Sequence, residues 1–85
     1  MTSVSVPTEI IDSVLERLRN ELRVYRSIVQ TFEKTYLTSL EAFERRIEQE
    51  GVLLETHEHW EDSIEWRNTR EEITKLETLL ARLNL

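Results

Sequence analysis

The stretch IDSVLERLRNELRVYRSIVQTFEKTY, residues 11–36, decides the fold. Its apolar side chains recur at alternating steps of four and three residues, which is the seam of a coiled coil. Pro7 and Glu9 suit a helix start, because proline tolerates the first turn and an acid favours the positive end of the helix dipole. We therefore expect a helix over residues 8–36. Its seam comprises Ile11, Leu15, Leu18, Leu22, Tyr25, Val29, Phe32 and Tyr36.

A second seam with the same alternation follows in residues 57–83, where we expect another long helix with Thr56 as its N-cap. An apolar stripe on a helix has to be buried against another element. The two long helices should therefore pack against each other. The second seam comprises Trp66, Thr69, Ile73, Leu76, Leu80 and Leu83.

A short helix is expected between the two long ones, over residues 39–50. Thr38 and Glu41 have the spacing of a capping box, and Gly51 suits a left-handed cap at the other end. The apolar residues of this segment, Leu40, Phe43 and Ile47, face one way.

The predicted fold class is all-α, with two long antiparallel helices and a short helix between them. Residues 1–85 form one domain, with residues 1–6 as a flexible lead. A chain this short buries a small fraction of its surface, so we expect the seams to pair two copies into a homodimeric helical bundle.

The composition agrees with this fold and limits the compartment. The chain has one glycine, one proline and no cysteine, so it holds few turn residues and no disulfide. No targeting segment and no apolar run long enough for a membrane span is recognisable. We expect a cytoplasmic protein that does not enter membranes.

Acidic residues are concentrated in the second part of the chain. Of a net charge of −6, residues 8–36 contribute nothing, with five acids and five bases, whereas residues 37–85 hold twelve acids and six bases. Such a surface repels phosphate backbones and attracts basic proteins, so no direct nucleic-acid binding is expected. The simpler interpretation, that the acids only keep the protein soluble, stays open.

The start of the last helix is the predicted partner-binding surface. Trp60 and Ile64 fall roughly opposite the seam, and tryptophan off the main stripe is enriched at interfaces. Packing of Trp60 beneath the short helix is the alternative. The predicted partner-binding residues are Glu58, Trp60, Glu61, Asp62, Ile64 and Glu65.

No cofactor, metal site or catalytic site is predicted. His57 and Glu61 stand four residues apart, but His57 and His59 point about 200° apart on a helix and cannot easily share a metal ion. The chain has no phosphate-binding loop or nucleophile elbow, so we expect a protein that is not an enzyme. The basic row Arg19, Arg23 and Arg26 is interpreted as solvated or paired within its own helix, or as facing the acids of a second copy.

From Leu22 onward the chain resembles a class of short, acidic helical proteins of archaea and bacteria that are encoded beside small toxin-like proteins and regarded as antitoxins. Leu37 stands where those proteins carry glycine. The likeness rests on residues 32–36 (FEKTY), 39–44 (SLEAFE), the Glu50-Gly51 turn and residues 60–66 (WEDSIEW).

The resemblance implies an acidic module that neutralises a basic toxin by covering its substrate-binding surface. Two alternatives use the same residues differently. In one, the chain is a structural or adaptor protein that acts by helical self-association. In the other, it is an acidic nucleic-acid mimic.

Overall fold

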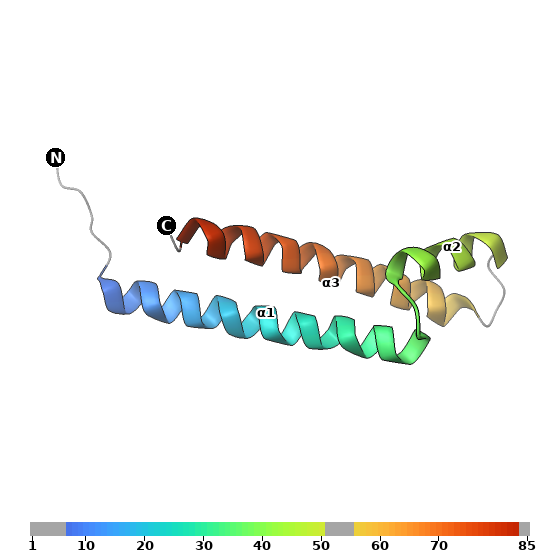
Figure 1. The fold of residues 1–85 in the computed structure, drawn as a ribbon, viewed down its shortest axis with the longest axis horizontal. Coiled ribbons are helices and arrows are strands. Elements are labelled where there is room, and N and C mark those ends of the chain that lie inside the picture. Colours follow the sequence, from blue (N-terminus) through green and yellow to red (C-terminus); the bar gives the residue numbers. More distant parts are fainter. Residues whose placement is uncertain (1–6, 51–55, 84–85) are drawn as a thin grey trace.

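The computed structural model describes residues 7–50 and 56–83. Within them the chain forms three helices, α1 (Thr8–Tyr36), α2 (Leu40–Glu50) and α3 (Thr56–Leu83), and no strand. Helices α1 and α3 run antiparallel side by side, and α2 lies against one half of this hairpin (Figure 1). We call the end near Tyr36 and Thr56 the closed end, and the other end the open end. The all-α prediction of two long helices with a short one between them is confirmed.

The limits of the helices agree closely with the sequence pattern. Helix α1 has the predicted bounds, while α2 begins one residue later and α3 one residue earlier than expected. None of the three described helices is both long and apolar enough to cross a bilayer. The predicted flexible lead, residues 1–6, lies outside the described residues.

Both seams are buried within one chain, α1 against α3. In the open half, Leu18, Tyr25 and Ile73 pack around a buried cluster made of Leu15, Leu22, Leu76 and Leu80. Each such leucine contributes roughly 1.5–3 kcal/mol when fully buried. The outermost seam residues are exceptions, because Ile11 and Leu83 remain 38% and 41% exposed.

An aromatic cluster joins all three helices in the closed half. Trp66 of α3, 1% exposed, stacks on Phe32 of α1 with ring centroids 5.5 Å apart. Phe43 of α2 lies against Trp66, at 5.8 Å, and against Tyr36, at 4.2 Å. Because these rings are large and closely packed, they dominate the energy of docking α2. Leu40 completes the buried cluster, with Val29 and Ile47 packed against it.

Ion pairs at the surface accompany this docking. Arg67 of α3 donates from Nε to Glu44 Oε2 at 2.7 Å and also bonds the second oxygen. Arg70 reaches Glu41 at 2.5 Å, and both side chains of that pair are about half exposed. Because solvent screens exposed pairs of this kind, they contribute far less than the burial of Phe43.

The connection between α1 and α2 differs from the predicted capping. Leu37 takes a left-handed conformation, φ 55° and ψ 36°, and its N–H donates to the Glu33 carbonyl. Ser39 caps α2, since its Oγ accepts a hydrogen bond from the Ala42 N–H at 3.2 Å. The capping role predicted for Thr38 was therefore wrong. The predicted cap at Gly51 and the side chain of Thr56 lie outside the described residues.

Candidate protein-binding surface

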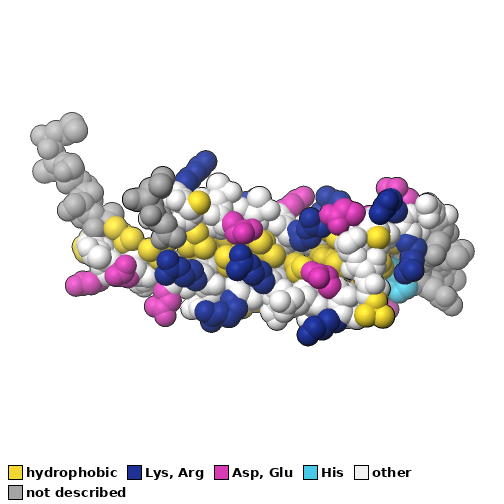
Figure 2. Space-filling model, in the orientation of Figure 1, with side chains coloured by type: hydrophobic (Ala, Val, Ile, Leu, Met, Phe, Trp, Pro, Cys, Tyr) yellow, Lys and Arg dark blue, Asp and Glu magenta, His cyan; other side chains and the backbone are white. Residues whose placement is uncertain are grey.

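The α1–α3 hairpin has two unlike faces. Helix α2 packs on one face of the hairpin, over its closed half, and we call this face the α2 face. We call the opposite face, which α2 does not reach, the open face. Figure 2 shows the α2 face, where a line of apolar side chains is visible between the long helices and acidic and basic groups are interspersed around it. The open face carries a different balance of charge.

A groove of about 460 Å³ runs along the open face between α1 and α3. Three carboxylates enter its lining, and no Lys or Arg among the described residues does. Glu72 holds the Lys75 ammonium at 3.2 Å, and Glu61 contacts the His57 ring at 3.2 Å. Glu65 has no ion-pair partner among the described residues. The lining comprises Tyr25, Glu61, Ile64, Glu65, Asn68, Thr69 and Glu72.

The open face continues past this groove as an apolar surface. Leu79 follows Glu72 by seven residues, about two turns, and therefore lies on the same side of α3. Val14 precedes Tyr25 by eleven residues, about three turns, and so shares its side of α1. Val14 is 44% exposed and Leu79 is 42% exposed. Val14 and Leu79 thus expose apolar surface toward the open end, and the carboxylates of the groove lie in the half beyond it.

The structure divides the six predicted partner-binding residues. Glu61, Ile64 and Glu65 line the open-face groove. Trp60 lies on the outer side of α3, is 45% exposed and has its ring 6.1 Å from that of His57. The alternative that Trp60 packs beneath the short helix was therefore wrong, since α2 covers Trp66 instead.

The remaining two, Asp62 and Glu58, face the end of α1. The Tyr36 hydroxyl donates a hydrogen bond to the Asp62 carboxylate. Burial, this hydrogen bond and the negative charges of Asp62 and Glu58 all raise the pKa of Tyr36 above its ordinary value. The phenol is therefore protonated at neutral pH, and Asp62 is committed to an internal contact rather than to a partner.

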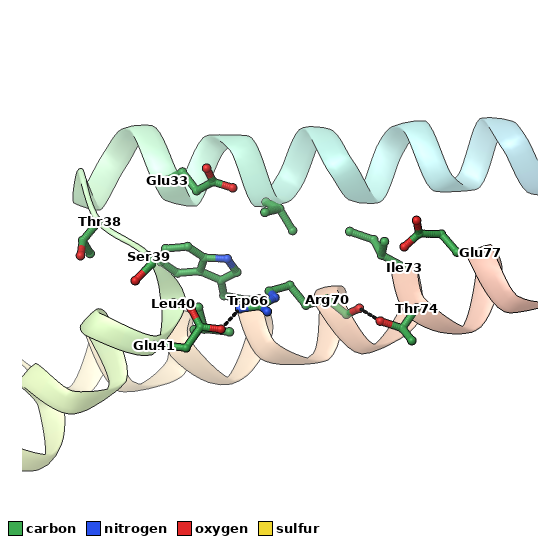
Figure 3. A pocket seen from close by; sticks show the side chains of 11 residues that line it. Glu33, Thr38, Ser39, Leu40, Glu41, Trp66, Arg70, Ile73, Thr74 and Glu77 are labelled. Atoms are coloured by element: carbon green, nitrogen blue, oxygen red, sulfur yellow. Dashed lines mark hydrogen bonds and ion pairs between the residues drawn. The ribbon is translucent and has the colours of Figure 1, made fainter.

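A second groove, of about 740 Å³, lies on the α2 face beside the start of α2 (Figure 3). Arg70 enters its lining and reaches Glu41, and this hydrogen bond lowers the pKa of the Glu41 carboxyl. Glu77, also in the lining, pairs with Arg26 at 3.4 Å. Because Arg70 stands in the lining itself, whereas no described Lys or Arg lines the open-face groove, this second groove is the weaker candidate for a basic partner.

Trp66 forms part of the wall of this second groove. Figure 3 shows its indole between α1 and α3. The indole N–H is buried without a hydrogen-bond partner among the described residues, an arrangement that costs about 1–3 kcal/mol.

The basic row of α1 lies along the α2 face. Arg19, Arg23 and Arg26 line a shallow depression there together with Leu22. Arg26 pairs with Glu77 of α3, so pairing within its own helix was the wrong expectation for this residue. Arg19 and Arg23 are exposed and form no ion pair with any described residue.

The histidine cluster has been separated by the fold. His57 stays beside Glu61, whereas His59 packs edge-on against Tyr36 and Phe43, at 5.5 and 6.0 Å. Across residues 7–50 and 56–83, no group of three or more His, Cys, Asp or Glu side chains is arranged to hold a metal ion.

No protein-family model, curated protein or solved structure matches this chain. The resemblance to acidic antitoxins therefore stays an expectation, and the surface has to be interpreted from its own residues. Sequence reasoning missed Tyr25, Asn68 and Thr69 as groove residues, and it missed the exposed Val14 and Leu79. A signal was present for the last two, since both are apolar and both stand one position outside the seam.

Proposed function

We propose that this chain is a non-enzymatic protein-binding module of the antitoxin type, which neutralises a basic partner through an acidic helical surface. The observation that carries the proposal is the open-face groove, where Glu61, Glu65 and Glu72 enter the lining and no described Lys or Arg does. Complementary charge speeds association with a basic protein and discriminates against acidic ones. We place this activity in the cytoplasm, in keeping with the absence of cysteine.

The chemistry of a basic partner explains why such a surface would inhibit it. A protein that acts on nucleic acid presents Lys and Arg to phosphate groups. Carboxylates on one face of a helix can occupy those side chains in place of the phosphates. The resemblance to proteins encoded beside small toxins supports this choice of partner, and α3 supplies the carboxylates.

The test is co-expression with the product of the neighbouring reading frame. That product alone should arrest growth of the host, and this chain should relieve the arrest. The two proteins should co-purify at about 0.05 M salt and separate at about 0.5 M, because exposed charges are screened over about 4 Å at the higher concentration.

A matched pair of variants isolates the surface. Replacing Glu61, Glu65 and Glu72 together by Gln should abolish the rescue. Neutralising three exposed acids of α1 (Glu9→Gln, Asp12→Asn and Glu16→Gln) removes the same charge elsewhere and should leave the rescue intact. Equal losses in both triple variants, or a complex that withstands high salt, would contradict the proposed mode of binding.

A second candidate function is structural, through self-association into a homodimeric helical bundle. Exposed Val14, Leu79 and Leu83 at the open end favour it, because two copies could bury these side chains together. Light scattering behind size-exclusion chromatography distinguishes the two. A salt-resistant dimer supports self-association, and a compact monomer leaves the surface free for another protein. An acidic nucleic-acid mimic would use the same carboxylates and differ only in its partner.

A further inference from the structure

We infer that the open face receives a single amphipathic helix of the partner, aligned with α1 and α3, with apolar residues over the open end and Lys or Arg over the groove. The inference rests on the proposed function and specifies the segment that is bound. It follows from the shape of the open face, from its charge, and from the order in which the acidic groove and the apolar surface follow each other along the hairpin.

The open face has the shape of a channel between the two long helices, α1 and α3, which lie side by side. In an antiparallel pair, the register that brings Tyr25 beside Glu72 brings Val14, eleven residues earlier, opposite Leu83, eleven residues later. Both helices therefore contribute apolar side chains to the same stretch. An amphipathic helix laid in such a channel buries its stripe against both walls. On the opposite face α2 packs with Leu40 and Phe43 against Trp66 of α3, so a third helix already docks on the closed half of this hairpin.

The charge favours a basic helix over a second copy of this chain. The groove presents three carboxylates against one ammonium, since Lys75 pairs with Glu72, and the nearby Arg17 is paired with Glu21 of its own helix. A second copy that docked through this same face would bring the same excess of carboxylate to the contact. A basic segment neutralises it instead.

The order along the axis sets the length and pattern of the bound helix. Glu61 and Leu83 stand 22 residues apart on α3, a distance of about 33 Å, which matches a helix of about 20 residues. Such a segment carries a stripe at helical spacing, with its basic residues gathered at the end that meets Glu61 and Glu65.

The test uses two synthetic 20-residue peptides as probes. One has leucine at helical spacing, with lysines gathered at one end; the other has the same lysines but serine in place of every leucine. Amide chemical shifts of the ¹⁵N-labelled full chain locate the contact. We expect the striped peptide to change the amide chemical shifts of Val14, Asn68 and Leu79. The amide signals of Arg19 and Arg23, on the opposite face, should not change.

Neutral substitutions then separate apolar contact from charge. The double variant Val14→Gln, Leu79→Gln should bind the striped peptide roughly tenfold more weakly, because both open-end side chains lose apolar burial. Leu37→Gln changes an exposed leucine remote from this face and should bind as the unaltered chain does. All of these positions are exposed, so the variants keep the fold.

Each other outcome overturns the inference. Shifts confined to the α2 face, or equal weakening by Leu37→Gln, would remove the open face as the docking surface while leaving the co-expression result untouched. Equal binding of the unstriped peptide would show that charge alone acts. A dimer of the free chain that the double variant abolishes would show that the occupant is a second copy. Failure of the neighbouring product to bind or be neutralised counts against the proposed function itself.

Discussion

The hydroxyl of Tyr36, the last residue of α1, donates a hydrogen bond to the Asp62 carboxylate on α3. Tyr36 also packs against Phe43 of α2, so one side chain contacts both other helices at the closed end. This contact commits Asp62 to the closed end, so that of the predicted partner-binding acids only Glu61 and Glu65 line the open-face groove, together with Glu72.

Tyr36 should make the protein sensitive to alkali. Its pKa is raised in the folded chain, whereas the unfolded chain ionises near the ordinary value of 10.0. Because the folded-state pKa of Tyr36 is the higher one, its contribution to stability is complete below pH 10, the pKa of the unfolded chain. The contribution is lost as the pH rises from there toward the folded-state pKa. The midpoint of thermal unfolding should therefore fall steeply above about pH 10. Tyr36→Phe should lower the unfolding free energy at pH 7 by about 1 kcal/mol, because the hydrogen bond to Asp62 is lost. The variant should also show a smaller decrease of the unfolding midpoint above about pH 10. An equally steep fall in the variant would contradict this origin.

Docking of α2 should depend on burial rather than on ion pairs. Phe43 is 2% exposed, so Phe43→Ala should cost about 3–5 kcal/mol in urea unfolding and reduce the helical signal as α2 detaches. Glu41→Gln and Glu44→Gln remove the pairs with Arg70 and Arg67, and each should lower the unfolding free energy far less than Phe43→Ala does, because solvent screens these pairs. If either Gln variant lowered the unfolding free energy more than Phe43→Ala, ion pairs rather than burial would hold α2 in place.

The fold was predictable because its determinants are periodic. Alternating steps of three and four residues place side chains on one side of a helix whatever the surroundings, so α1 and the packing of its seam against that of α3 followed from spacing. The choice between Thr38 and Ser39 as a cap did not follow from spacing, because both residues suit the role. It depends on where Leu40 has to sit to be buried beside Trp66.

The candidate surface was only partly predictable. Glu61, Ile64 and Glu65 were identified from acidity and from their position off the seam. Asp62 was included on the same grounds, but it turns to Tyr36, a residue 26 positions away whose approach only the tertiary fold determines. Tyr25 was assigned to the seam, and it also lines the groove. A pattern that divides residues only into buried and exposed does not reveal that one side chain does both.

Seam positions and their neighbours on α1 should respond differently to the same charge. Leu22 is 7% exposed and Val24 is 58% exposed. Leu22→Asp buries an unpaired carboxylate and removes an apolar contact, so the variant should be unfolded by circular dichroism at 25 °C. Val24→Asp should change the unfolding free energy by about 0.5 kcal/mol or less. A soluble and folded Leu22→Asp variant would refute the seam.

Leu37 is where a single substitution should stabilise the protein. Its φ of 55° places a Cβ-bearing residue in the left-handed region, which costs about 1–2 kcal/mol, and its side chain is 86% exposed and contributes little packing. Glycine has no such cost but is more flexible when unfolded, so Leu37→Gly should raise the unfolding free energy in urea by about 1 kcal/mol. Leu37→Ala removes the same exposed side chain and keeps the Cβ, and it should give no comparable gain. If alanine stabilised as much as glycine, the benefit would come from removing an exposed leucine, and the left-handed cap would not be the cause.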